Sequence, residues 1–434
     1  MNSKLKFILI FFFFFLIALI FRSWFFPFVC LSSGDLSFFF KENIKESSIL
    51  PFLWRISNLG SMNFFHWSGF YSGTTSIVSS FFNFSWPISV RIFWFWPFVI
   101  LSIFSSIYLF KSFFSYSLFF CLFSSLIYTT NTYILITTGI GQKGILMAYS
   151  IAPLVLGRFI RIMESGNTME IQWKHNGNNR KDKEESEKGK ILRESLIFGL
   201  ILAVQIMWDL RIAYITLIAC GLYVFYQWYL RKFSFSFLIS HFSFLISILI
   251  VLGLHSYWIL PLLITQRSGG TPIQDLGSAY ITTEAVEYLS WGKFEQTISL
   301  LHSLWPESIY GKTGFMKPEF LVLPILAYGS LLFIKKKTDN KKQITKNRNI
   351  LFFSLLGLLG AFLSKGSNPP LGRVYLWLFK HFPGMIMFRD ATKFYLLTAL
   401  SYSVLIPFSV FQIYLLIKKL TGSRVNGLTS SEKL

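Results

Sequence analysis

The stretch Phe7 to Phe21 reads FILIFFFFFLIALIF and has no polar side chain in fifteen consecutive positions. The apolar run continues to Val29, and a membrane-crossing helix requires roughly 17–25 apolar residues. A cleaved signal peptide is the alternative, but no small-x-small cleavage site follows and many further apolar stretches do. We therefore expect Phe7–Val29 to be the first of several membrane spans, with Lys4 and Lys6 just before it.

The composition of the whole chain supports a membrane protein. The 434 residues are 53% hydrophobic and 14% charged, where a soluble domain carries roughly 25% charged residues. This excludes a soluble globular protein, because too little polar surface is present to cover the apolar side chains. It also excludes intrinsic disorder, which requires low hydrophobicity. Cys30, Cys121 and Cys220 show no spacing pattern, which excludes a disulfide scaffold or a Cys-rich metal site.

Nine further apolar stretches predict membrane helices, which gives an all-α polytopic membrane protein with about ten spans. Residues 129–143 are ambiguous, because the third helix can continue through Ile136. An even number of spans places both termini on the same side. The nine stretches are Ile88–Phe110, Phe113–Tyr128, Gly144–Ile160, Ile191–Trp208, Ile212–Leu230, Phe237–Ile259, Phe320–Ile334, Ile350–Leu363 and Phe394–Ile417.

The basic residues indicate the orientation of these spans. The net charge is +21, and cytoplasmic loops of membrane proteins collect Lys and Arg. The ten-span topology places every short basic cluster and both termini on the cytoplasmic side of a cell membrane. The mixed-charge loop 161–190 is interpreted as a solvated linker, and no stacking motif or folded basic domain supports nucleic-acid binding. The clusters are Lys111, Arg231–Lys232, Lys335–Lys337 and Lys418–Lys419.

This topology leaves three long segments outside the cell, Cys30–Pro87, Pro261–Glu319 and Ser364–Lys393. Long loops of this kind are more than connectors, so we expect function on the outer face. Their apolar stretches predict short helices lying at the membrane interface. These stretches are Phe38–Phe40, Phe64–Phe65 and Tyr375–Phe379, with Trp54, Trp67 and Trp377 as interfacial anchors.

Asp35 is the first acidic residue of the chain and closely follows the first span, in the sequence Gly34-Asp35-Leu36. A carboxylate at the outer membrane surface can act as a base on a hydroxyl that arrives from water, while a lipid-borne substrate arrives from the bilayer. The alternative is that Asp35 caps a helix that begins at Leu36. The two interpretations stay open on this motif.

The last outer segment ends in FPGMIMFRDATKF, residues 382–394. Arg389 and Lys393 are four residues apart, so on a helix they would share a face at the start of the last span. Two cations beside a helix N-terminus suit a phosphate, and Arg373 lies earlier in the same segment. The alternative is an interfacial anchor that Asp390 partly neutralises.

Two further features invite a functional interpretation. Asp209-Leu-Arg211 lies in the outer turn between the fifth and sixth spans, where charges are costly enough to suggest a role; a local ion pair is the alternative. Gly139-Ile-Gly141-Gln-Lys-Gly144 has dinucleotide-fingerprint spacing, but no strand or βαβ unit surrounds it. We expect it to form a tight turn between two spans.

The sequence provides no firm metal site. The six His residues form no i,i+4 pair and no HExxH motif. Glu284 and Glu287 lie three residues apart in the second outer loop and are better interpreted as a solvated helix face than as cation ligands. We therefore assign no metal-binding residue.

Taken in order along the chain, these motifs resemble the GT-C superfamily of membrane glycosyltransferases, and most closely bacterial YfhO-like and arabinofuranosyltransferase-type members. Gly34-Asp35 follows the first span, and Pro51-Phe-Leu-Trp54 lies in a long first outer loop. Further matching segments are GILMAYSIAPLVL (144–156), His302-Ser-Leu-Trp305-Pro306 and the Phe-Pro-Gly…Phe-Arg-Asp…Lys-Phe pattern of residues 382–394.

The resemblance implies a seven-helix transmembrane module over residues 1–260, with its first outer loop at 30–87. A second large outer loop would cover 261–319. A three-helix C-terminal part would cover 320–434, with the outer segment 364–393. It also implies that Asp35 is the catalytic aspartate, and that a lipid carrier lies beside the outer loops. Some members use a divalent cation and others do not, so the resemblance allows a divalent cation without requiring one.

The resulting hypothesis is a membrane glycosyltransferase that moves a sugar from a polyprenyl-phosphate donor to a glycan, lipid or protein acceptor on the outer face. Asp35 would deprotonate the acceptor hydroxyl and the anomeric carbon would invert. Arg389 and Lys393, with Arg373, Asp390 and Arg211 as further substrate contacts, would hold the donor. The alternative is a non-enzymatic membrane protein: a lipid or oligosaccharide flippase, a transporter or an assembly scaffold.

Overall fold

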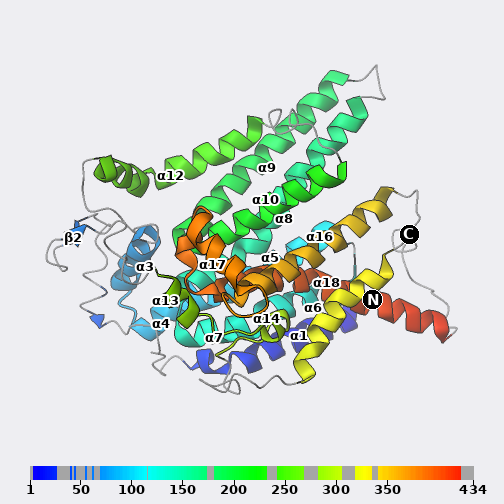
Figure 1. Ribbon diagram of the computed structural model, residues 1–434, viewed down its shortest axis with the longest axis horizontal. Coiled ribbons are helices and arrows are strands. Elements are labelled where there is room, and N and C mark those ends of the chain that lie inside the picture. The colour runs from blue at the N-terminus through cyan, green and yellow to red at the C-terminus, as the bar shows by residue number, and fades with distance from the viewer. Residues whose placement is uncertain are drawn as a thin grey trace. The chain divides into compact units, whose positions relative to one another are not determined.

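The computed structural model describes residues 3–26, 40–41, 44, 54–55, 61–62, 69–114, 116–173, 180–231, 242–267, 282–304, 318–334 and 341–421. Helices make up nearly all of the regular structure in these ranges (Figure 1). The strands within them, β1 (Trp54–Arg55) and β2 (Ser61–Met62), form one short antiparallel pair. The predicted all-α fold is confirmed.

The chain divides into two compact units, which are described separately. The first contains Met1–Ser37, Phe95–Leu146 and Ala279–Leu434, and the second contains Phe38–Trp94 and Met147–Ser278. The division predicted at residues 260 and 320 stays a prediction.

In the first unit the longest C-terminal helix, α18, lies at the centre and packs against α5, α6, α15 and α16. The apolar side chains from Tyr395 to Leu405 are fully excluded from solvent, so this helix forms the core of the unit. The helices are α1 (Ser3–Ile20), α5 (Trp96–Phe113), α6 (Leu118–Thr129), α7 (Thr132–Ile140), α13 (Thr283–Tyr288), α14 (Phe294–Ile298), α15 (Val322–Gly329), α16 (Lys341–Ser364), α17 (Gly372–His381) and α18 (Tyr395–Leu420).

The second unit is built on α9, which packs against α12, α10 and α3 (Figure 1). Its helices are α3 (Gly69–Phe81), α4 (Trp86–Val90), α9 (Arg180–Trp208), α10 (Leu210–Arg231) and α12 (Phe242–Arg267), together with most of α8 (Lys143–Trp173). A π-helical turn, η3 (Arg91–Phe95), joins α4 to α5.

Within the described ranges, seven helices are long and apolar enough to cross a membrane, and the bent pair α6–α7 makes an eighth if it forms one span. This indicates a multi-pass membrane protein. The predicted seventh and eighth spans correspond to shorter apolar helices, Leu245–Pro261 and Pro318–Phe333, and the total of ten stays a prediction. The seven are Ser3–Ile20, Trp86–Phe113, Lys143–Glu164, Gly189–Trp208, Leu210–Tyr229, Gln343–Ser364 and Ala391–Leu420.

The ambiguous region after the third predicted span is a bend of 46° between α6 and α7. Asn131 produces it, because its side chain accepts a hydrogen bond from Ile134 N–H and donates one to the Tyr128 carbonyl. The second helix ends at Gly141, whose φ of 82° lies in the left-handed region that favours glycine. The predicted tight turn at this glycine is confirmed.

Helices α16 and α18 approach closely because small residues face each other. A Cβ on Gly360 would lie 2.6 Å from the Thr398 backbone nitrogen, and one on Gly357 would lie 2.5 Å from Ser401 Oγ. That hydroxyl donates to the Phe353 carbonyl across the interface at 2.6 Å. Small residues and interhelical hydrogen bonds are the usual means of joining membrane helices. This contact fixes the first turns of α18, which directly follow the predicted site residues Arg389, Asp390 and Lys393.

Candidate functional site

The predicted base Asp35 lies outside the described residues, so its role stays a prediction. The described part of the predicted site is the segment before α18. It contains α17 and two 3-10 turns, η7 (Met385–Phe388) and η8 (Ala391–Phe394). Arg389 and Asp390 connect the two turns, and Lys393 lies in the second one.

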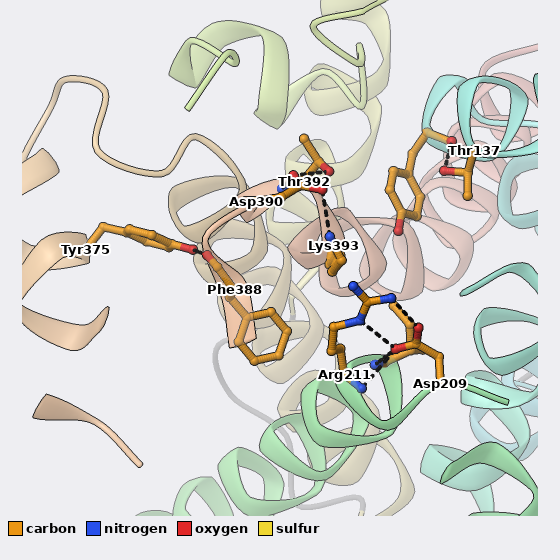
Figure 2. Close-up of polar contacts among 10 residues, drawn as sticks. Thr137, Asp209, Arg211, Tyr375, Phe388, Asp390, Thr392 and Lys393 are labelled. Carbon is orange, nitrogen blue, oxygen red and sulfur yellow. Dashed lines mark hydrogen bonds and ion pairs between the residues drawn. The ribbon is translucent and has the colours of Figure 1, made fainter. Parts of the chain in front are cut away.

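Asp390 and Lys393 form an ion pair directly before α18, with Lys393 Nζ 2.6 Å from Asp390 Oδ2 (Figure 2). The other carboxylate oxygen, Oδ1, accepts from the Thr392 backbone N–H and from its hydroxyl. Asp390 therefore caps η8 and holds Lys393 at the same time. The Lys393 side chain is 5% exposed and the Asp390 side chain 25%, so Asp390 is the more accessible member of the pair.

Arg389 and Lys393 do not share a helix face, and that expectation was wrong. The i,i+4 argument requires a continuous helix, whereas Asp390 has an extended backbone conformation that separates η7 from η8. As a result Arg389 is exposed and Lys393 is buried. The structure brings Lys393 to Asp390 instead.

A third polar group, the buried imidazole of His302, interacts electrostatically with both members of this pair. His302 follows α14 and is 3% exposed. Its ring Nδ1 accepts a hydrogen bond from the Leu304 backbone N–H at 3.1 Å. The proton of the neutral ring is therefore on Nε2, and among the described residues that nitrogen has no hydrogen-bond partner.

The loop that carries His302 is held by hydroxyl groups of two helices. Thr132 Oγ1 accepts from the His302 backbone N–H at 2.8 Å and donates to the Leu300 carbonyl. Tyr395 donates to the Leu301 carbonyl at 2.8 Å. These bonds hold Leu300 at a φ of 52°, which is costly for a non-glycine residue. Such strain persists only where the surroundings fix it, and it is concentrated at functional sites.

Aromatic rings enclose the imidazole. The rings of Tyr133 and Tyr395 stack at 5.7 Å between centroids, and the His302 ring lies 6.0 Å from the first and 5.5 Å from the second. All three side chains are nearly inaccessible to solvent. The orientation of the imidazole is thus set by packing as well as by hydrogen bonds.

The burial and charges of this cluster determine its protonation. Burial lowers the pKa of His302 to about 4; the negative charge of Asp390 opposes this shift and the positive charge of Lys393 adds to it. Burial alone would raise the pKa of Asp390, but the charge of Lys393 and the hydrogen bonds from Lys393 and Thr392 hold it below its ordinary value. At neutral pH the site therefore presents a carboxylate beside an uncharged imidazole.

Arg373 lies at the start of α17 and is exposed. This helix is amphipathic: Tyr375 and Phe379 are buried, while Val374 and Trp377 are exposed. The Tyr375 hydroxyl donates to the Phe388 carbonyl, which joins α17 to η7 (Figure 2). The short helix predicted at Tyr375–Phe379 is present, and its location at a membrane interface stays a prediction.

Arg211 belongs to the second unit and pairs with Asp209, with Nη2 2.6 Å from Oδ2 (Figure 2). Asp209 also accepts from the backbone N–H groups of Arg211 and Ile212, so it caps α10. The structure therefore agrees with the alternative interpretation of this motif, a local ion pair.

Within the described part of the chain, no three His, Cys, Asp or Glu side chains are grouped as metal ligands would be.

Asp390 and Lys393 are candidates from the sequence alone, whereas His302 is not. The segment His302-Ser-Leu-Trp305-Pro306 was noted only as part of a family resemblance. A lone His between apolar residues has no distinguishing spacing, because its partners come from α7 and α18, far away in sequence.

The sequence and the structure were compared with known protein families, curated proteins and solved structures, and none of them matches this chain.

Proposed function

We propose that this protein is a GT-C-type membrane glycosyltransferase that moves a sugar from a polyprenyl-phosphate donor to an acceptor on the outer face, with inversion at the anomeric carbon. The observation that carries the proposal is the Asp390–Lys393 ion pair beside neutral His302, at the end of a membrane-spanning helix. The order of motifs that resembles the GT-C superfamily gives independent support.

A cluster of this kind contributes little to the stability of a fold. Burying an ammonium group costs several kcal/mol, and its ion pair repays this cost only partly. Ionisable groups at membrane helices are accordingly rare and associated with function. A carboxylate, an ammonium and an imidazole N–H are groups that bind sugar hydroxyls.

The membrane setting fits the proposed donor. A polyprenyl carrier is too apolar to leave the bilayer, so an enzyme that uses it needs an active site at the membrane surface. The seven or eight apolar helices among the described residues fit this setting, and α17 carries exposed apolar and basic side chains next to the cluster in sequence. The glycan, lipid or protein acceptor would arrive from water.

The proposed reaction is a single displacement. Asp35 takes the proton of the acceptor hydroxyl while that oxygen forms a bond to the anomeric carbon. The bond from this carbon to the phosphate oxygen breaks, and the polyprenyl phosphate leaves with the electron pair. The phosphate needs cations rather than an acid, and the exposed Arg389 and Arg373 suit that role. Lys393 donates one of its three N–H groups to Asp390, which fixes that carboxylate.

The deciding experiment compares glycans and lipid extracts from cells with and without the protein. We expect a glycan that lacks one sugar in the deletion, restored by wild-type protein and by Asp35→Glu more weakly. Asp35→Asn is expected to reduce transfer by at least about 10²-fold at unchanged membrane abundance. Full restoration by Asp35→Asn would remove Asp35 from the mechanism.

The same cells test the non-enzymatic alternative. If the deletion leaves every glycan complete and instead shifts a lipid-linked sugar from one leaflet to the other, the protein is a flippase or transporter. If it changes neither, the enzyme proposal fails and an assembly scaffold is the better interpretation. Arg389→Ala adds a separate test, since unchanged affinity for the lipid donor would exclude this residue from phosphate binding.

A further inference from the structure

Lys393 has more hydrogen-bond donors than its surroundings use. A protonated Lys carries three N–H donors, and among the described residues Asp390 Oδ2 is the acceptor for Nζ. The side chain is 5% exposed, so water has little access to the remaining two donors. Buried donors without acceptors are unfavourable, which indicates that another group completes this site when the protein is active.

His302 presents the same situation. Its Nε2–H has no acceptor in the described part of the chain. Leu304 N–H and two tyrosine rings fix the imidazole, and Thr132 holds the backbone of the same residue. A side chain held this firmly cannot turn to find another acceptor. Two under-used donors therefore belong to a cluster that also contains the partly exposed Asp390 carboxylate.

Donors beside an acceptor match a hydroxyl group, which both donates and accepts. Neighbouring hydroxyls on a sugar ring present several such groups at fixed spacing. A phosphate group offers acceptors alone, and the Asp390 carboxylate would repel it. The exposed Arg389 and Arg373 stay the candidates for the phosphate.

We propose that His302, Asp390 and Lys393 bind the ring hydroxyls of a sugar, with His302 Nε2–H and Lys393 Nζ donating and the Asp390 carboxylate accepting. This assignment deepens the proposed function and rests on it for the identity of the ligand as the transferred sugar. His302 is then a ligand-contacting residue, and Lys393 binds the sugar rather than the lipid phosphate. Thr132 and Tyr395 act indirectly, by holding the loop that presents His302.

The test uses free sugars and the full-length purified protein, without lipid donor or acceptor. A panel of methyl glycosides of glucose, mannose, galactose and arabinose is titrated, and binding is followed by saturation-transfer NMR. We expect at least one glycoside to bind, and Asp390→Asn to weaken its binding by about tenfold or more. His302→Phe keeps an aromatic ring between the tyrosines and removes Nε2–H, with a similar expected loss.

Glu194→Gln is the matched control, because Glu194 is 23% exposed and pairs with Arg158 in the second unit much as Asp390 pairs with Lys393. It is expected to bind the glycoside within twofold of wild type. His302→Gln keeps an uncharged N–H donor and is expected to retain more binding than His302→Phe; it replaces the latter if that variant does not fold.

The two proposals fail separately. Absence of binding to every glycoside, or equal binding by wild type, Asp390→Asn and His302→Gln or His302→Phe, would overturn the sugar site whatever the transfer assay shows. Glycoside binding that depends on these residues, in a protein that transfers no sugar in cells, would keep the sugar site and overturn the transferase proposal.

Discussion

Thr132 and His302 lie 170 positions apart and are joined by a hydrogen bond from the His302 backbone N–H to the Thr132 hydroxyl, at 2.8 Å. The same hydroxyl donates to the carbonyl of Leu300, so one side chain satisfies a donor and an acceptor of a single loop. Thr132 begins α7, directly after the bend that Asn131 produces. The bend between α6 and α7 thus positions Thr132 next to this loop.

Replacing Thr132 by Val should loosen the loop. Val has nearly the same shape but leaves the His302 N–H and the Leu300 carbonyl buried without their partner, which costs about 1–3 kcal/mol. We expect a lower melting temperature of the detergent-purified protein. Thr132→Ser keeps the hydroxyl and should stay close to wild type. Equal stability of the Val and Ser variants would show that these hydrogen bonds do not hold the loop.

Mild acid should destabilise the protein through His302. Its pKa is about 4 when folded and about 6.5 when unfolded, so between these values the unfolded chain binds more protons. This contribution is fully present above pH 6.5 and is lost as the pH falls towards 4. The difference amounts to on the order of 3 kcal/mol. Asp390 contributes to the pH dependence at lower pH. Its pKa is lowered in the folded protein, so the stability that it adds is lost only as the pH falls below its ordinary pKa of about 4.

Melting temperatures measured from pH 7.5 to 4.5 test this expectation. Wild type should lose stability over this range, and His302→Gln should lose less because it cannot be protonated. The charged groups that interact with His302 are Asp390 and Lys393, so the profile is also measured for Asp390→Asn. His381→Gln removes an exposed histidine and serves as the control. Parallel profiles for wild type and His302→Gln would contradict the assignment.

The sequence predicted the helical fold well, because long apolar runs admit few alternatives to a membrane helix. The runs at Ser3–Ile20 and Ala391–Leu420 show this directly. The site was predicted only in part. Asp390 and Lys393 are three residues apart, so their contact is local, whereas His302 meets them through pairing over long sequence distances. The error over Arg389 arose because spacing alone does not show that a helix is interrupted at Asp390.

The contact between α16 and α18 should be intolerant of a single methyl group. Ala at Gly360 would place Cβ 2.6 Å from the Thr398 backbone nitrogen and 2.7 Å from Leu397 Cβ, neither of which can move without shifting α18. We expect a loss of about 1–3 kcal/mol and a reduced yield of folded protein. A Cβ on Gly221 in α10 would meet no described atom outside its own helix within 4 Å, so Gly221→Ala is the matched control and should fall within about 1 kcal/mol of wild type. Equal stability of the two variants would contradict the close packing.

The orientation of the spans determines on which side of the membrane the candidate site lies. Cysteine labelling of selected positions measures this orientation. Glu284 is exposed on α13, and Lys418 is partly exposed near the end of α18. Three predicted spans separate them, so they should lie on opposite sides, with Glu284 outside because basic clusters such as Lys418–Lys419 stay in the cytoplasm. In a chain without native Cys, a membrane-impermeant maleimide should label Glu284→Cys in intact cells and Lys418→Cys only after permeabilisation.

The reverse pattern would move the site to the cytoplasmic face, where the acceptor would have to be an intracellular molecule. Labelling of both positions from one side would show that an even number of spans separates them, so that one of the shorter helices does not cross.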